Sequence, residues 1–186
     1  MSFACAVLAA GVLGLAAPRA EAGKKKTVQV PALTTEHKHP AGGMAFRTPE
    51  NWTVESSTAH PETVNASGDG VAVRFVYHDG EQGYDSLHGV CMLERLASAM
   101  DMAPVVEYEY DFVGGEVAGR RALDSAFVVT YDAPILGARE WRQRNVTIVG
   151  NGSSLCAITY APAALWKKSA PTRALLDAVL ASVTFR

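Results

Sequence analysis

Apolar residues recur at every second position along much of this chain, which predicts a protein built mainly from β-strands. The pattern is clearest at 71–77 and at 106–112. A period of two residues is typical of strands that bury one face. Shorter or less regular runs predict further strands at 27–30, 43–47, 48–54, 118–131, 139–149, 154–160 and 182–185.

Two segments instead repeat their apolar residues with the 3.6-residue spacing of a helix. The first covers 87–102, where Asp85 or Ser86 can cap the start and Pro104 prevents continuation. The second covers 170–181. Its predicted buried residues are Leu175, Leu176, Val179 and Leu180.

Turn-forming residues separate these elements. Gly150-Asn151-Gly152 predicts a tight turn between two strands, and Gly114-Gly115 predicts the end of the strand at 106–112. Residues 55–69 are rich in Ser, Thr, Asn and Gly and predict a loop. Together the elements predict an α+β fold in which helices cover a mostly antiparallel sheet of about six strands.

The beginning of the chain indicates export. An apolar run, Phe3–Ala17, is followed by Ala20-Glu21-Ala22, a small-x-small sequence typical of a signal-peptide cleavage site. The run is shorter than the roughly 20 residues that a membrane-spanning helix needs. We predict a periplasmic or extracellular mature chain without a membrane span, an uncleaved tether being the alternative. The predicted organisation is a signal peptide at 1–22, an extended lead-in at 23–41 and one domain at 42–186.

The charge of the chain argues against nucleic acid as a partner. Its formal net charge is −2, and Lys24-Lys25-Lys26 is the only cationic run. Nucleic-acid binding depends on a basic patch or stripe that neutralises phosphates. Three lysines at a new N-terminus are expected to aid solubility only.

Three cysteines are present, and Cys91 and Cys156 remain after the predicted cleavage. An oxidising compartment permits a disulfide between them. The predicted helix at 87–102, however, places Cys91 on the flank of its apolar stripe, whereas Cys156 lies in a predicted strand. This placement favours two separate, partly buried thiols, and a Cys91–Cys156 disulfide is the alternative.

One face of the strand at 106–112 carries the carboxylates Glu107, Glu109 and Asp111. Carboxylates two residues apart on a strand lie about 7 Å from one another, so a divalent cation would need a further ligand from a neighbouring strand. A solvated face paired with arginines of other strands is favoured, and a cation site is the alternative. The candidate arginines are Arg120, Arg121, Arg142 and Arg144.

Histidine patterns give weaker indications of chemistry. His37 and His39 lie on one side of an extended segment but supply at most half of a zinc site, so a solvent-exposed pair is favoured. His88 and Cys91 share a face of the predicted helix, as a thiol nucleophile and its base would, but no third residue orients them. The chain has no Gly-x-Ser-x-Gly, His-Glu-x-x-His, Cys-x-x-Cys or glycine-rich phosphate loop. We therefore expect neither an enzyme nor a cofactor.

Three stretches share their order and spacing with a known family. They are Phe46–Trp52 with its Pro-x-x-Trp turn, Val113–Arg120 with its glycines, and the closing segment with Ala161-Pro162, Trp166 and Leu176–Phe185. In these stretches the chain resembles the PsbP-like α/β/α sandwich superfamily, which includes DcrB-type bacterial envelope proteins. The resemblance extends over 42–186 and implies that fold.

The resemblance also implies an accessory, adaptor or binding role, without a shared catalytic constellation. We expect an exported, non-enzymatic accessory protein that contacts another, unidentified envelope protein through the sheet edge and the loops at 55–69 and 132–138. The alternative is a protein that binds a small ligand or a divalent cation through the three carboxylates. A thiol hydrolase using His88 and Cys91 is a third possibility.

Overall fold

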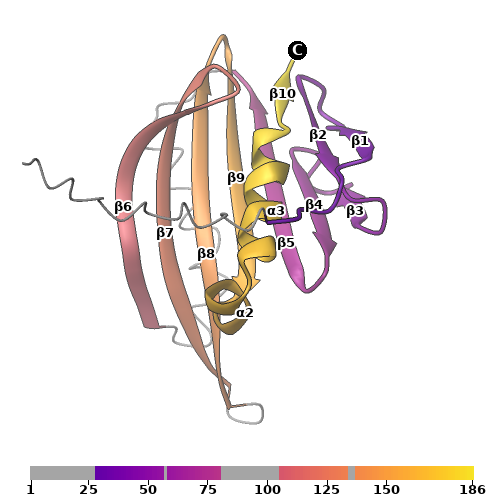
Figure 1. Cartoon of the computed structure of the whole chain (residues 1–186). Helices are drawn as coiled ribbons and strands as arrows, with labels where there is room; N and C mark the ends of the chain where they lie inside the picture. The colour runs from indigo at the N-terminus through magenta and orange to yellow at the C-terminus, as the bar shows by residue number, and fades with distance from the viewer. Residues whose placement is uncertain (1–27, 57, 81–104, 134–136) are drawn as a thin grey trace, which may run out of the picture.

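The computed structural model describes residues 28–56, 58–80, 105–133 and 137–186, which form ten strands and two helices (Figure 1). The strands are β1 (Thr35–Lys38), β2 (Met44–Thr48), β3 (Thr53–Ser56), β4 (Thr63–Gly68), β5 (Val71–Asp79), β6 (Val105–Val117), β7 (Arg120–Ala133), β8 (Gly137–Gly150), β9 (Ser153–Pro162) and β10 (Thr184–Phe185). The helices are α2 (Ala163–Lys168) and α3 (Ala170–Ala181). The predicted strand-rich α+β fold is therefore confirmed, while the predicted helix at 87–102 lies outside the described residues.

Seven strands form one antiparallel sheet in the order β3-β4-β5-β9-β8-β7-β6. The predicted tight turn joins β8 to β9, with φ values of 56° at Asn151 and 75° at Gly152. Positive φ at both central residues is the mark of a type I′ turn, whose twist matches that of the flanking strands. Ala118 and Gly119, with φ values of 51° and 72°, make the same kind of turn between β6 and β7.

Two predicted boundaries are wrong for the same reason, which is pairing with a neighbouring strand. β6 continues through Gly114-Gly115 because residues 113–117 pair in regular register with β7. Within the predicted loop at 55–69, β4 pairs with β5 and turns Val64 and Ala66 inward. The structure therefore has more strands than the six predicted, and the helices in its described part are few and short.

A second sheet has three strands in the order β1-β2-β10, so the start of the described chain lies beside its end. Its first strand forms at 35–38, where β2 supplies pairing partners, and not at the predicted 27–30. Residues 28–34 carry no regular structure. β10 falls within the predicted closing strand at 182–185 and pairs with the beginning of β2.

α3 has the bounds that the sequence predicts. The Ser169 side chain caps it by accepting a hydrogen bond of 3.2 Å from the Thr172 backbone N–H, and Pro171 lies in its first turn. All of the residues predicted to be buried are buried, namely Leu175, Leu176, Val179 and Leu180. α2 was not predicted and contacts β8 and β9. Neither helix in the described ranges has the length and apolar character of a membrane span.

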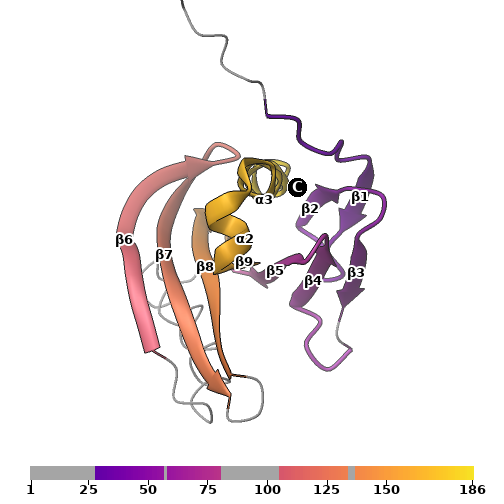
Figure 2. The ribbon, with the colours of Figure 1, turned by 60° about the horizontal axis from the view of Figure 1, so that its bottom comes forward.

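The main core lies between α3, the small sheet and one face of the large sheet. Phe46 of β2 contacts Phe75 of β5 there, with ring centroids 4.4 Å apart. Figure 2 shows the large sheet curving around α2 and α3, and we call the side on which these helices lie the concave face. β6 and β7 extend beyond α2 and α3, and the part of the concave face that neither of these described helices covers is called its uncovered part (Figure 2).

The opposite face of the large sheet also carries buried side chains. Val76, Ile158 and Tyr160 form a second cluster there with Cys156. Cys156 is fully buried and disulfide-bonded, and its partner lies outside the described residues. Two separate thiols, the interpretation favoured from the sequence, do not fit this bond. Because the chain has three cysteines, the partner is Cys5 or Cys91, and the Cys91–Cys156 pair stays a prediction.

Candidate functional site

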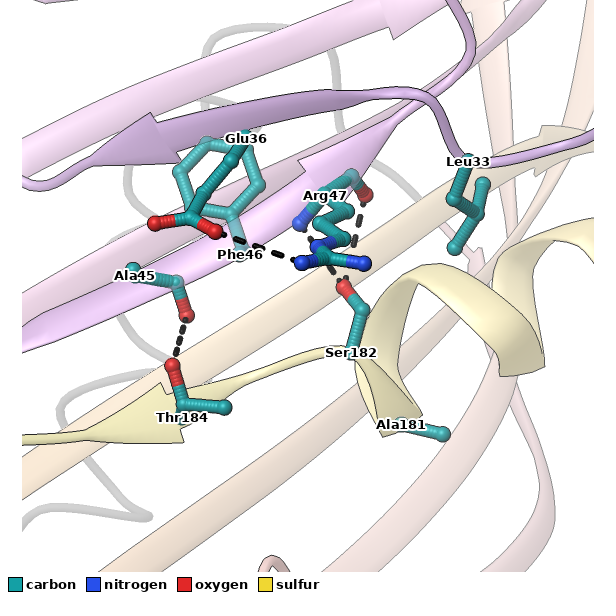
Figure 3. Close-up of a pocket in the computed structure, with 8 residues that line it drawn as sticks. All are labelled: Leu33, Glu36, Ala45, Phe46, Arg47, Ala181, Ser182 and Thr184. Carbon is teal, nitrogen blue, oxygen red and sulfur yellow. Dashed lines mark hydrogen bonds and ion pairs between the residues drawn. The ribbon is translucent and has the colours of Figure 1, made fainter.

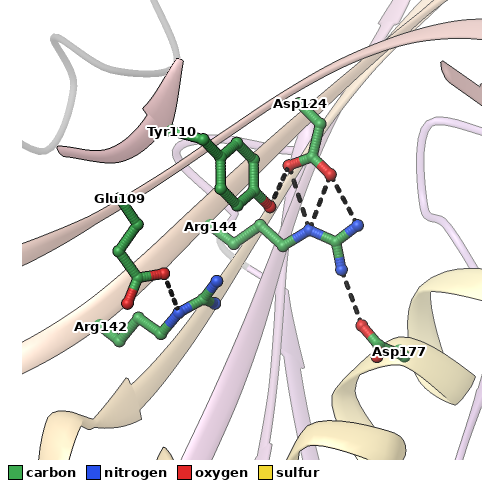
Figure 4. Close-up of polar contacts among 6 residues, drawn as sticks. All are labelled: Glu109, Tyr110, Asp124, Arg142, Arg144 and Asp177. Atoms are coloured by element: carbon green, nitrogen blue, oxygen red, sulfur yellow. Dashed lines mark hydrogen bonds and ion pairs between the residues drawn. The ribbon is translucent and has the colours of Figure 1, made fainter. Parts of the chain in front are cut away.

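The uncovered part of the concave face carries a cluster of charged side chains, which we call the charged cluster (Figure 4). Its members come from β6, β7, β8 and α3 and converge on two arginines of β8. They are Glu109, Tyr110, Asp124, Arg142, Arg144 and Asp177. Strands β7 and β8 pair from Ala122 and Ile148 to Ala133 and Gly137, so residues at alternate positions of both strands reach the same face.

Arg144 is held between two carboxylates. Its Nε lies 3.1 and 3.0 Å from the two carboxylate oxygens of Asp124, and its Nη2 lies 2.7 Å from one of them. Its Nη1 donates to Asp177 of α3 at 2.7 Å. Burial lowers the pKa of Arg144, but the hydrogen bonds and negative charge of Asp124 raise it further, so the net shift is upward. The guanidinium is therefore a fixed positive charge with a fixed orientation.

Tyr110 and Asp124 share a hydrogen bond. The Tyr110 hydroxyl donates to Asp124 Oδ1 at 3.1 Å. Burial and the charge of Asp124 raise the pKa of this hydroxyl, so it remains protonated and continues to donate. Asp124 thus receives donors from β6 and β8 at once and links three strands of the sheet.

Arg142 lies deeper than Arg144, with only 6% of its side chain exposed. Its Nε donates to Glu109 Oε2 at 2.7 Å, and its guanidinium carbon lies 3.7 Å from the centre of the Trp166 ring of α2. A guanidinium over an indole face is a stabilising cation–π arrangement. Arg142 therefore ties the edge strand β6 to the helix pair.

An irregularity in β6 brings two consecutive side chains to this cluster. The register with β7 shifts between Tyr108 and Tyr110, so Tyr108 lies opposite Phe127 and Tyr110 lies opposite Ala126. The centre of the Tyr108 ring lies 5.7 Å from that of the Phe127 ring, in a tilted arrangement, on one side of the sheet, while the Tyr110 hydroxyl donates to Asp124 on the other. The predicted strict alternation, with both tyrosines on one face, is wrong here because a bulge adds a residue.

The three carboxylates predicted to share one face of the strand, Glu107, Glu109 and Asp111, have different surroundings in the structure. Glu109 pairs with Arg142, as the interpretation of an ion-paired face expects. Glu107 is exposed, and the side chain of Asp111 lies outside what the structure describes. Among the described residues, no group of three His, Cys, Asp or Glu side chains is placed to hold a metal ion. A cation site that includes Asp111 stays a prediction.

A hollow of about 380 Å³ adjoins the charged cluster, between α3 and the turn from β6 to β7. Arg144 and Asp177 contribute to its wall, together with Glu116, Val117 and Leu180. The side chain of Asp177 is 57% exposed and that of Glu109 is 34% exposed. Carboxylate oxygens on this surface can therefore accept hydrogen bonds from a partner.

A second hollow, of about 420 Å³, lies where the small sheet meets the end of α3 (Figure 3). Glu36 pairs there with Arg47 at 3.4 Å and with Arg186 at 3.2 Å. The backbone N–H of Arg47 donates to Ser182 Oγ at 2.8 Å, and Thr184 Oγ1 donates to the Ala45 carbonyl at 3.5 Å. These polar groups bind one another, so the contacts around this hollow hold the small sheet against the end of α3.

The histidines at 37 and 39 are not a solvent-exposed pair. His37 shares a hydrogen bond of 2.9 Å with Thr48 and stacks on Phe46. His39 is 2% exposed and lies beside Tyr77, and its Nδ1 accepts a hydrogen bond from the Ala41 N–H. Burial lowers the pKa of both rings. The pair therefore stabilises the small sheet in its neutral form, and the exposed arrangement favoured from the sequence is wrong.

We expect the protein to lose stability as the pH falls below about 6.5, partly because of His39. Its burial lowers its pKa more than the nearby Glu62 raises it. Just below pH 6.5 the His39 ring is protonated in the unfolded chain but remains neutral in the folded protein, so a falling pH favours unfolding. Urea unfolding measured from pH 7.5 to pH 5 should show a shallower decline for His39→Gln. His60→Gln, at a 70% exposed side chain, is the matched control, and an unchanged slope for His39→Gln would contradict the assignment.

Other residues that the sequence singled out are not brought to this site. His88 and Cys91, the possible thiol nucleophile and base, lie outside the described residues. Of the predicted contact loop at 132–138, only the flanking ends of β7 and β8 are described. The sequence alone did not identify Asp124 or Asp177 as members of this site. Asp124 could have been noticed, because it is a carboxylate among the mainly apolar residues 122–129.

The sequence matches no protein-family model and no curated protein. The structure, however, is similar to cyanobacterial PsbP (CyanoP) from Synechocystis, with a TM-score of 0.59 at 12% identity over 82% of this chain and 92% of that one. It is also similar to the Ran-binding protein Mog1p of Saccharomyces cerevisiae, with a TM-score of 0.50 at 11% identity over 83% and 96% of the two chains. The chain has the PsbP-like fold. The predicted resemblance is thereby confirmed at the level of fold.

A larger protein also contains this PsbP-like fold. A protein from Bacteroides thetaiotaomicron matches with a TM-score of 0.52 at 10% identity over 83% of this chain but only 49% of its own length. The fold therefore occurs as one part of a longer chain as well as in chains of this size. At such identities these likenesses show the shared fold and leave the role of each side chain to be argued from this structure.

Proposed function

We propose that this protein is an exported, non-enzymatic accessory protein that acts by binding another protein of the cell envelope. The observation that carries the proposal is the charged cluster on the uncovered part of the concave face. Its arginines are fixed by ion pairs and by stacking, while Asp177 and Glu109 keep exposed oxygens. Charged groups that are oriented before binding give an interface its specificity and its association rate.

Two further observations support this proposal. The likeness to Mog1p relates the fold to a protein that binds another protein. The apolar run at 3–17 and the disulfide at Cys156 both favour an oxidising compartment outside the cytoplasm.

The proposal is tested by crosslinking in intact cells followed by affinity purification of the mature protein. We expect one envelope protein to be recovered reproducibly with the wild type. Reversing two exposed charges of the concave face, with Glu107→Lys and Asp177→Lys, should reduce its recovery about tenfold, because like charges then face the partner. Glu107 belongs to that face because it lies in the cross-strand row of Val128 and Arg142.

The control carries the same change of charge elsewhere. Glu50→Lys and Glu55→Lys alter two exposed carboxylates, one before β3 and one within it, at the opposite edge of the large sheet from β6, and should leave recovery unchanged. A clean monomer with no partner in any of these experiments would overturn the proposal. Equal loss with both double variants would show that net charge, and not the concave face, controls the recovery.

A further inference from the structure

Within the described part of the chain, β6 forms the outer edge of the large sheet, and this strand of 13 residues pairs there with β7. Exposed edges are usually short, or are blocked by lysine or proline, because they are templates for another strand. β6 contains neither lysine, arginine nor proline. Of the large apolar side chains that are exposed in the described part, Tyr108 and Val113 both belong to β6. This edge therefore lacks the usual features that prevent an exposed edge strand from pairing with another chain.

The turn that follows β6 determines which of its backbone groups face outward. In a two-residue type I′ hairpin, the residues that flank the turn form a hydrogen-bonded pair. Val117 and Arg120 flank this turn, and the register is regular back to Val113. Val113, Gly115 and Val117 therefore direct their backbone groups to β7. Gly114 and Glu116 direct theirs to the open edge.

Neither a close contact with the described residues nor a positive φ explains why Gly114 and Gly115 are glycines. A Cβ placed on Gly114 or on Gly115 would meet nothing within 4 Å, and neither residue has a positive φ. Glycine weakens a strand, and in a strand it often marks a place where another backbone approaches closely. The two glycines keep the edge clear of side chains beside the outward-facing groups of Gly114 and Glu116.

The charges around this edge specify the partner. The side chains of β6 that are charged at neutral pH are all carboxylates, and Asp177 adds another across the hollow beside Val117. Of the two arginines that begin β7, Arg120 is directed away from the edge, since its Nη1 donates at 2.7 Å to both the Gly150 carbonyl and Ser153, whereas Arg121 lies opposite Glu116 in the register with β6. A second copy of this chain would bring the same carboxylates into contact, and like charges on paired strands repel.

We propose that Val113–Val117 of β6 binds an extended, basic segment of a partner protein as an added strand. This inference rests on the proposed function and names the surface and the kind of partner. The outward-facing N–H and C=O groups of Gly114 and Glu116 pair with the backbone of the added strand. Its lysine or arginine side chains then reach the carboxylates of the concave face.

The test uses two synthetic octapeptides, one alternating lysine with valine and one alternating glutamate with valine. Nuclear magnetic resonance and amide hydrogen exchange are measured on the mature protein up to millimolar peptide. We expect the lysine peptide to slow exchange of the Gly114 and Glu116 amides, and added salt to weaken the effect. Gly114→Pro removes one outward N–H and should weaken binding about fivefold. Gly114→Ala keeps that N–H but adds a methyl group beside the edge, and should weaken binding less than Gly114→Pro does.

Three patterns of binding or protection overturn the inference. They are equal binding of the glutamate peptide, protection that appears away from β6, and protection that grows with protein concentration without peptide, which would indicate a second copy. Absence of binding at millimolar lysine peptide also overturns it. Crosslinking with Gly114→Pro separates this inference from the proposed function: a partner recovered undiminished refutes the edge alone, while no partner with any variant refutes the proposed function.

Discussion

Replacing Cys156 by serine is expected to lower the free energy of unfolding by about 4 kcal/mol under oxidising conditions. Cys156 is disulfide-bonded and fully buried on the sheet face opposite α2 and α3. If Cys91 is its partner, the bond closes a loop of about 65 residues, and the chain-entropy model gives a loss of this size when such a loop is opened. Few other single changes should cost as much, since a typical domain is stable by about 5–15 kcal/mol.

The partner is identified by measuring Cys91→Ser, Cys156→Ser and the double variant by urea unfolding, each with and without a reductant. A Cys91–Cys156 bond predicts nearly equal losses in all three, because one bond is removed once. A reductant should then bring the wild type down to the level of the variants. A Cys91→Ser protein as stable as the wild type would instead show that the bond goes elsewhere.

The parts of the fold that could be predicted are those with local signals. β5 follows from alternation along the chain, β7, β8 and β9 follow from less regular apolar runs, and the turn that joins β8 to β9 follows from Asn151-Gly152. α3 follows from Ser169, Pro171 and the apolar spacing behind them. Each signal lies within a few residues of the structure that it specifies, so a single sequence contains all of it.

The parts that could not be predicted depend on neighbours that are distant along the chain. β4 has polar residues at the positions that face away from the core and becomes a strand through its pairing with β5. β6 passes through Gly114-Gly115 because β7 supports it there. Both segments gain backbone hydrogen bonds by pairing with a neighbouring strand, which outweighs their weak strand propensity.

The charged cluster shows the same division. The sequence suggested arginines as partners of the acidic face, and Arg142 does bind Glu109. It could not show that Arg144 would instead bind Asp124 and Asp177, which lie 20 and 33 residues away along the chain. The bulge that turns Tyr110 toward Asp124 was also invisible, since it is defined by the register between two strands.

Replacing Gly68 by alanine is expected to lower the free energy of unfolding by about 2–3 kcal/mol, which is large for the addition of one methyl group. Trp52 is 6% exposed and lies over the end of β4, and its Nε1 donates to Asp69 Oδ2 at 3.1 Å. A Cβ on Gly68 would lie 2.2 Å from Trp52 Cδ1 and 2.6 Å from its Nε1, so the indole would have to leave its position. Gly68 has no positive φ, so the cost would arise from this contact and not from the backbone.

Urea unfolding monitored by tryptophan fluorescence measures both the stability and the environment of the indole. The matched control is Gly115→Ala, which adds the same methyl group to a strand glycine that has nothing within 4 Å and should change stability little. Trp52→Phe in the Gly68→Ala background should recover part of the loss, because the smaller ring leaves more room beside residue 68. Equal stability of Gly68→Ala and Gly115→Ala would show that Trp52 can move without cost. The Pro-x-x-Trp turn would then owe little of its stability to contact with β4.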